Sequence, residues 1–133
     1  MTQAEPLVAF TVAGEPASKA RPIFTTRGGK PRAITPAETV AAEGKVAWSF
    51  RLAVRKHDTA GPFGVMVLFH LGNRRRRDVD NMLKLVLDAL NGVAWDDDHQ
   101  VLEVTARKVQ ATAETARTEI VIYRPGDHAA VAG

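Results

Sequence analysis

Residues 64–101, GVMVLFHLGNRRRRDVDNMLKLVLDALNGVAWDDDHQV, carry the pattern that determines the fold. Residues 64–71 are a continuous β-rich run, which is typical of a strand covered on both faces. From Val79 to Leu90 the apolar residues recur at intervals of three and four, and this spacing predicts a helix with one apolar face. Residues 101–109 alternate as a strand that runs back across the sheet. The segment is therefore predicted to be a strand–helix–strand unit.

Shorter elements flank this unit on both sides. Residues 7–12 and 119–123 have strand composition, and residues 17–35 form a long basic loop that could fold as a hairpin around Gly28-Gly29. A helix is predicted after Pro36, extending to about Lys56. The residues expected to share one of its faces are Val40, Ala47, Phe50 and Val54.

These elements predict a single α/β (α+β) domain. We expect a mixed sheet of about four or five strands with two main helices over residues 1–124, and a flexible C-terminal tail at residues 125–133. The chain has no cysteine, which excludes disulfides, thiolate zinc sites, iron–sulfur clusters and cysteine nucleophiles. Its longest apolar stretch, residues 65–71, is too short to span a bilayer, so we expect a cytoplasmic protein with no membrane partner.

The net charge of +3 is modest, but the cations are concentrated in two segments. The second segment is Arg74–Arg77, immediately before two aspartates. The first lies between Glu15 and Glu38, and its cations are Lys19, Arg21, Arg27, Lys30 and Arg32. Basic patches of this kind favour binding to nucleic acid, although a solvated, positively charged loop has the same composition.

Aspartates follow the arginine segment directly. Asp80, Lys84 and Asp88 recur every four residues and therefore line one polar edge of the predicted helix, with Asp78 just before it. A triplet, Asp96–Asp98, follows the helix. An antiparallel return of the next strand would carry this triplet away from Asp78, so the spacing alone leaves open whether these carboxylates meet.

If the carboxylates do meet, a cation must sit among them to keep them ionised. Carboxylate oxygens without nearby histidine or cysteine favour Mg²⁺ or Mn²⁺ over zinc, and such a metal can activate water against a phosphodiester. Lys84 could then neutralise charge that develops on the phosphate. The alternatives are structural: Asp78 as an N-cap, Asp80 and Lys84 as a helix-surface pair, and the triplet as a solvated turn.

At these residues the sequence resembles the RusA family of Holliday-junction resolvases. The resemblance covers residues 74–84 (RRRRDVDNMLK), then Asp88-Ala-Leu, then residues 95–101 (WDDDHQV), and Lys19–Pro22 (KARP) is similar to a basic N-terminal motif of phage and prophage members. It implies a homodimeric nuclease that makes paired nicks in opposed strands of a four-way junction. It also implies a nucleoid-associated protein of host, phage or prophage origin.

The resemblance assigns roles residue by residue. Asp78, Asp80 and Asp98 would bind a catalytic Mg²⁺, for which Mn²⁺ could substitute, with Lys84 assisting and Asn81 in a supporting position. Asp97 also falls on a family acid, so the choice between Asp97 and Asp98 stays open. The residues expected to bind DNA are Lys19, Arg21, Arg74, Arg75, Arg76 and Arg77.

Two other functions remain compatible with the sequence. One is a non-catalytic module that binds branched DNA through the same basic segments. The other is a nuclease that acts on branched DNA other than the four-way junction. A pure binding module gains nothing from aspartates placed against its own phosphate-binding arginines, and this favours the nuclease.

Overall fold

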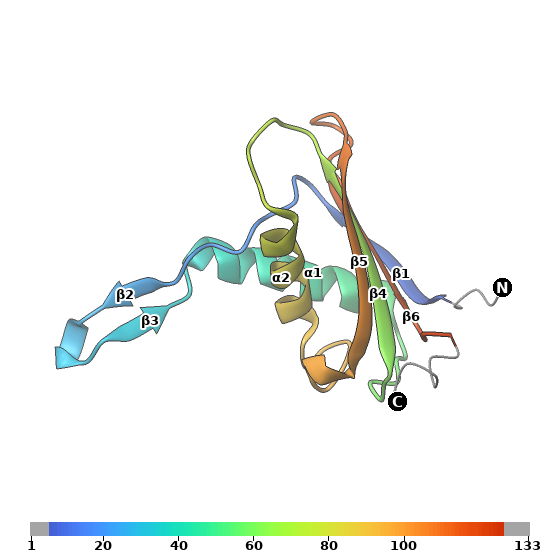
Figure 1. The fold of residues 1–133 in the computed structure, drawn as a ribbon, viewed down its shortest axis with the longest axis horizontal. Helices are drawn as coiled ribbons and strands as arrows, with labels where there is room; N and C mark the ends of the chain where they lie inside the picture. Colours follow the sequence, from blue (N-terminus) through green and yellow to red (C-terminus); the bar gives the residue numbers. More distant parts are fainter. Residues whose placement is uncertain (1–5, 127–133) are drawn as a thin grey trace.

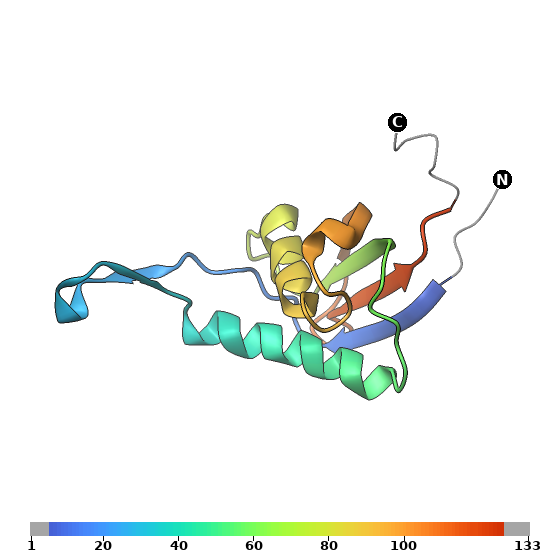
Figure 2. The same cartoon turned by 90° about the horizontal axis from the view of Figure 1, so that it is seen from below.

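The computed structural model describes residues 6–126, in which two helices lie on one side of a four-stranded sheet and a two-stranded hairpin projects to the side (Figures 1 and 2). The elements in chain order are β1 (Pro6–Ala13), β2 (Ile23–Thr25), the 3-10 turn η1 (Arg27–Gly29), β3 (Arg32–Ile34), α1 (Ala37–Ala53), β4 (Phe63–Leu71), α2 (Val79–Leu90), the 3-10 turn η2 (Asp98–Gln100), β5 (Val101–Gln110) and β6 (Arg117–Tyr123). Within residues 6–126, no helix is long and apolar enough to cross a membrane. The predicted mixed sheet with two helices is confirmed.

The main sheet has the strand order β1-β6-β4-β5. Strand β4 pairs antiparallel with β6 and parallel with β5, and β1 pairs antiparallel with β6. Parallel neighbours need a long crossover, which α2 provides between β4 and β5. Strand β5 therefore runs in the same direction as β4, and α2 runs back between them.

The hydrophobic core lies between the helices and one face of the sheet. On β4 the buried residues alternate, with Phe63, Val65, Val67 and Phe69 facing the helices. Met66 on the other face is 37% exposed, so the prediction of a strand covered on both faces is wrong. The run is apolar throughout, yet helices cover only one side of the sheet.

Helix α1 buries only part of the predicted face. Phe50 is buried and Val54 packs against the core, as predicted, whereas Val40 is 56% exposed. Thr39 and Val46 are buried as well, where the helix packs on α2 and β1. The helix ends at Ala53 rather than near Lys56. Apolar residues occur all around this helix, so their spacing alone did not identify the buried side.

The predicted hairpin around Gly28-Gly29 is confirmed. Strands β2 and β3 pair antiparallel, and both glycines at the tip have positive φ, a conformation that glycine adopts without steric cost. The hairpin projects away from the sheet and helices in both views (Figures 1 and 2). The predicted flexibility of the tail falls mainly on residues 127–133, which lie outside the described residues.

Candidate active site

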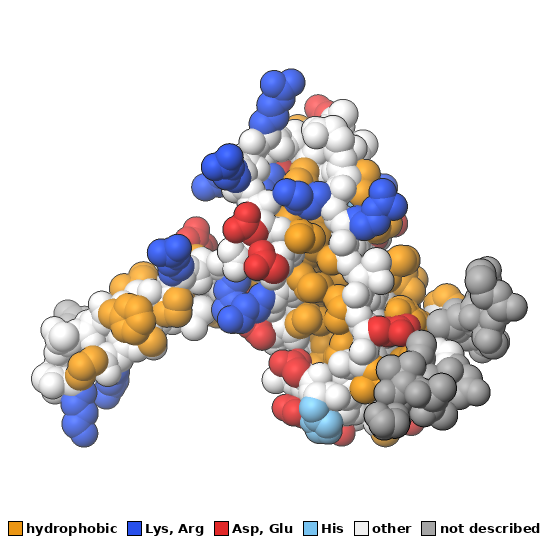
Figure 3. Space-filling view, in the orientation of Figure 1, with side chains coloured by type: hydrophobic (Ala, Val, Ile, Leu, Met, Phe, Trp, Pro, Cys, Tyr) orange, Lys and Arg blue, Asp and Glu red, His pale blue; other side chains and the backbone are white. Residues whose placement is uncertain are grey.

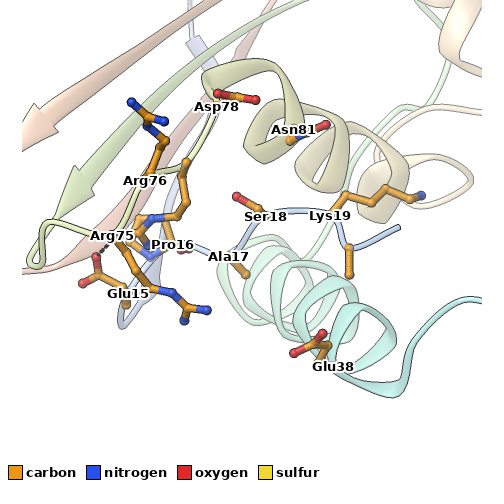
Figure 4. A pocket seen from close by; sticks show the side chains of 12 residues that line it. Glu15, Pro16, Ala17, Ser18, Lys19, Glu38, Arg75, Arg76, Asp78 and Asn81 are labelled. Atoms are coloured by element: carbon orange, nitrogen blue, oxygen red, sulfur yellow. Dashed lines mark hydrogen bonds and ion pairs between the residues drawn. The ribbon is translucent and has the colours of Figure 1, made fainter. Parts of the chain in front are cut away.

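A cleft of about 610 Å³ opens beside the first turn of α2 (Figure 4). Arg75 and Arg76, from the loop after β4, form one wall, and Asp78 and Asn81 on α2 form another. Ser18, from the segment after β1, lies beneath that first turn. Basic and acidic side chains also lie side by side over this part of the surface (Figure 3). The arrangement places cations for phosphate groups next to a carboxylate.

Asp78 occupies the N-cap position of α2, but its side chain makes no capping hydrogen bond. Within residues 6–126 its carboxylate has no ion-pair partner either. The carboxylate of Asp80, two residues further along the chain, accepts a hydrogen bond from the backbone N–H of Asn81 at 2.9 Å. The structural alternative, in which Asp78 caps the helix, is therefore not what the fold uses, and this carboxylate is available to a ligand.

A second, more apolar groove of about 320 Å³ lies along α2, on the side of β5. Its charged lining comes from Asp80, Lys84, Asp88 and Asp98. Lys84 forms no salt bridge in the part of the chain that the structure describes, so the alternative of a surface pair with Asp80 is not what the fold uses. The Lys84 ammonium group is thus uncommitted and lies in a groove rimmed by carboxylates.

The two candidate acids of the triplet are held differently. Trp95, which is fully buried, donates its indole N–H to Asp98 at 3.0 Å, and Asp98 faces the groove beside α2. Asp97 instead caps η2 in a capping box with Gln100 and contacts His99 Nδ1 at 2.5 Å. The hydrogen bonds from His99 lower the pKa of Asp97. Asp98 is therefore the better placed of the two to act with α2.

The acids assigned to the metal do not form one cluster in the single chain. Residues 6–126 contain no group of three or more His, Cys, Asp or Glu side chains placed to hold a metal ion. Asp78 opens onto the arginine cleft, whereas Asp80 and Asp98 line the groove on the other side of α2. Mg²⁺ commonly takes one or two protein carboxylates and completes its shell with water and substrate phosphate. The unpartnered carboxylate of Asp78 fits this kind of binding.

The four consecutive arginines have different environments. Arg77 is only 10% exposed and donates to Pro16 O at 2.7 Å, Glu15 Oε1 at 2.6 Å and Asn73 Oδ1 at 2.6 Å. Arg74, Arg75 and Arg76 are exposed. Arg77 therefore fastens the loop after β4 to the segment after β1, and the other three point their charge outward.

Glu15, which the sequence did not single out, anchors this loop. Both of its carboxylate oxygens accept from the backbone N–H of Gly72, at 3.0 and 3.1 Å, and one also accepts from Arg77. Burial pulls the pKa of Glu15 upward, but the hydrogen bonds from Arg77 and Gly72 outweigh it and lower the pKa overall. A glutamate ahead of a proline carries no sequence pattern that would have identified this role.

Lys19 is also held inside the structure. Its ammonium group bonds Asp88 and lies 3.6 Å from Glu43, and its backbone N–H donates to Asn81 O. The hydrogen bond to Asp88 is the main reason that the pKa of Lys19 is raised. The partner of Asp88 is thus Lys19 and not Lys84. The DNA-binding role of Lys19 stays a prediction, because its ammonium group already pairs with Asp88 and Glu43.

Ser18 is a further residue that the sequence did not indicate. Its hydroxyl oxygen is buried and has no hydrogen-bond partner among the described residues, although Ser18 lines the cleft with Asp78 and Asn81. A buried hydroxyl group usually has a partner. Its position beneath α2 makes it a candidate to contact a group that enters the cleft.

Comparison with known proteins identifies related sequences. A family model described as Endodeoxyribonuclease RusA matches residues 13–123. The crossover junction endodeoxyribonuclease RusA of Escherichia coli K12 is 32% identical over 102 residues, which cover 76% of this chain and 84% of that protein. The corresponding protein of Enterobacteria phage 82 is 36% identical over 69 residues, covering 51% and 57%. The uncharacterized protein YqaN of Bacillus subtilis is 29% identical over 140 aligned positions, covering 86% and 94%. The matched region includes both the cleft and the groove.

Proposed function

Because the chain belongs to the RusA family of endodeoxyribonucleases, we propose that it resolves four-way (Holliday) junctions by metal-assisted hydrolysis of phosphodiester bonds. The observation that carries this proposal is the cleft in which Arg75 and Arg76 lie beside the unpartnered carboxylate of Asp78. A nuclease needs cations for the DNA backbone next to acids for a metal ion, and this cleft offers both.

The exposed arginines are proposed to bind the DNA backbone. Arg74, Arg75 and Arg76 carry the charge that faces outward, and Arg21 adds to it from the segment after β1. Contacts with phosphates supply most of the affinity of such proteins, and they fix the position of the duplex without reading its sequence. Selectivity for a branched substrate would then come from the shape that these cations trace.

The acids along α2 are proposed to bind Mg²⁺. Asp78 and Asp80 would hold the ion, with Asp98 as the third carboxylate and Asn81 beside them. Bound there, the ion would polarise the phosphate and lower the pKa of a water molecule. Lys84, whose ammonium group is free of salt bridges in residues 6–126, would stabilise negative charge on the phosphate as it is attacked. The indole N–H of Trp95 orients the carboxylate of Asp98 from the core.

Symmetric resolution needs two such sites. A four-way junction has approximate two-fold symmetry, and a two-fold dimer presents two equivalent sites to two equivalent strands. A single chain offers one copy of the cleft and could nick one strand in each binding event. We therefore propose that the active form is a homodimer.

One observation favours a second candidate function, a module that binds branched DNA without cutting it. Within the described residues of one chain, no three acids come close enough to hold a metal ion. A binding module would keep the basic cleft and would not depend on Asp78, Asp80 or Asp98. Metal dependence of cleavage separates the two functions.

The decisive experiment is to incubate the protein with a labelled synthetic four-way junction in Mg²⁺ and to map the nicks in each strand. We expect paired nicks in opposed strands, lost without metal and in Asp80→Asn, with junction binding retained. Linear duplex of the same sequence is the substrate control. Asp97→Asn is the matched control for Asp98→Asn: we expect Asp98→Asn to abolish nicking and Asp97→Asn to retain it.

Each other outcome has a distinct meaning. Tight junction binding without cleavage in Mg²⁺ or Mn²⁺ would refute the nuclease and support the binding module. Equal cleavage of linear duplex would leave the metal site standing but refute junction specificity. Cleavage of flaps or forks in preference to four-way junctions would assign a different branched substrate.

A further inference from the structure

The outer face of α1 carries large apolar side chains that no described part of the chain covers. Val40, Trp48 and Leu52 are 56%, 62% and 70% exposed. They are spaced at multiples of four residues, with Gly44 completing the row between Val40 and Trp48. Residues at this spacing lie above one another on a helix, so they form a continuous stripe, opposite the side that packs on the core.

The remaining residues of this face are also poor in charge. The exposed residues on it are Ala37, Val40, Ala41, Gly44, Trp48, Arg51 and Leu52. Lys45 is exposed at the edge of this face, and its ammonium group is turned away to the backbone carbonyl of Ala13. A helix face in contact with water normally carries charged and polar residues. With Arg51 as its single cation, this face also lacks the charge that binding to DNA would require. The composition is that of a protein–protein contact, in which aromatic residues are enriched.

We propose that a second copy of this chain covers the stripe, with the two α1 helices packed antiparallel across a two-fold axis at the level of Val46. The stripe is complementary to itself in this arrangement. Gly44 of one copy faces Trp48 of the other, and Val40 faces Leu52. Stripes built on a four-residue spacing are the ridges that interdigitate when helices pack.

The fit at the centre follows from the sizes of the paired residues. A Cβ atom placed on Gly44 would meet no other atom within 4 Å, so the space above this glycine is open. The indole of Trp48 is the largest side chain on the face and would fill that space from the opposite helix. The two-fold axis repeats the contact, so each dimer contains two such tryptophan–glycine pairs.

The charges are compatible with this packing. In the same register Arg51 faces Ala41 of the other copy, so the two Arg51 side chains do not oppose each other. The 17 residues of α1 span about 26 Å, enough for the contact to extend over several turns. This interface rests on the homodimer of the proposed function and identifies the surface that forms it.

The first test is the mass in solution, measured by size-exclusion chromatography with light scattering. The unaltered protein is expected at twice the 14.4 kDa of the chain, and Trp48→Glu at the single mass. Leu102→Glu is the matched control, because Leu102 is 59% exposed on β5 and should leave the dimer intact. Circular dichroism would confirm that each variant is folded.

A swap of the paired residues tests the register itself. Gly44→Trp alone should dissociate the dimer, because two tryptophans would then compete for the same space. The double variant Gly44→Trp/Trp48→Gly recreates the tryptophan–glycine contact in reverse and should restore the double mass.

Three results would overturn the proposal: a monomeric unaltered protein, a dimer indifferent to Trp48→Glu, or a double variant that stays monomeric. None of these measurements involves cleavage. A protein that dimerises elsewhere and still makes paired nicks would therefore refute the interface and leave the nuclease standing.

Discussion

Four consecutive arginines precede α2, and the contacts of Arg77 predict that it differs in function from the other three. The test is to compare Arg77→Lys with Arg76→Lys and Arg76→Ala. Arg77→Lys keeps the positive charge but cannot reach Pro16, Glu15 and Asn73 together, because an ammonium group is a point charge and not a planar fork. Arg76 is exposed, and its guanidinium group has no partner within residues 6–126.

The size of the effect follows from the contacts. Hydrogen bonds to charged groups contribute about 1.5–3 kcal/mol each, but the contributions do not add fully. Glu15 is 30% exposed, so water would solvate part of its carboxylate once Arg77 is replaced. We therefore expect Arg77→Lys to lower the free energy of unfolding by about 2 kcal/mol, or the melting temperature by roughly 6–10 °C. Arg76→Lys and Arg76→Ala should change stability by less than about 0.5 kcal/mol.

Urea unfolding and junction binding over a range of salt concentrations measure the two roles separately. For Arg76→Ala, the slope of log affinity against log salt concentration should shrink by about 1, as expected for one lost phosphate contact. Arg77→Lys should keep the slope of the unaltered protein when it is measured where the variant is folded. If Arg77→Lys is as stable as Arg76→Lys, or if Arg77→Lys loses the same salt slope as Arg76→Ala, Arg77 does not differ in function from Arg76.

Two further predictions concern titration. Burial and the hydrogen bond from Tyr123 to Glu103, at 2.8 Å, raise the pKa of Tyr123 to about 12. Because the chain has one tyrosine, the absorbance of tyrosinate during a pH titration should show this pKa directly. The variant Glu103→Gln should lower the midpoint of that titration. Although burial opposes it, hydrogen bonding to Arg77 and Gly72 holds the pKa of Glu15 below its ordinary 4.5 in the folded state. Glu15 therefore stabilises the fold above that value, and its contribution is lost as the pH falls below about 5. Urea midpoints should fall less steeply with acid in Glu15→Gln, and equal slopes would contradict the assignment.

The strand–helix–strand unit is the part of the fold that the sequence predicted best. The apolar spacing from Val79 to Leu90 matches α2 because a helix on a sheet needs one apolar face, and that requirement appears in the spacing. The exposure of β4 was not predictable in the same way. Its residues are apolar on both faces, and the covered face depends on where α1 and α2 pack.

The buried face of α1 shows the same limit for a helix. Val46 and Phe50 pack on the core while Val40 and Trp48 face outward, although the sequence offers apolar residues on both sides. The proposed dimer would explain this composition, because a helix buried on two sides needs two apolar faces. Apolar residues on both sides of α1, which do not identify the buried side in one chain, are what a dimer interface on the outer side would require.

The residue types of the candidate site were predictable from the sequence, but the role of each residue was not. The sequence placed the aspartates and arginines near α2, and the cleft contains Arg75, Arg76 and Asp78. It did not indicate that Arg77 would be held by Glu15, which lies 62 residues earlier in the chain. A contact over this separation depends on how the segment after β1 crosses the end of the sheet.

Internal ties hold the segments that line the highly charged cleft. Arg77 bonds Glu15 and Pro16 on one side of the cleft, and Lys19 bonds Asp88 on the other, so the segment after β1 is fixed at both ends. Each tie uses an acid that lies outside the metal-binding set. The cations that remain exposed, Arg74 to Arg76, therefore project from a loop whose base is already held. Fixed cations need less reordering when they meet a phosphate, and this preorganisation is what binding and positioning of a DNA backbone require.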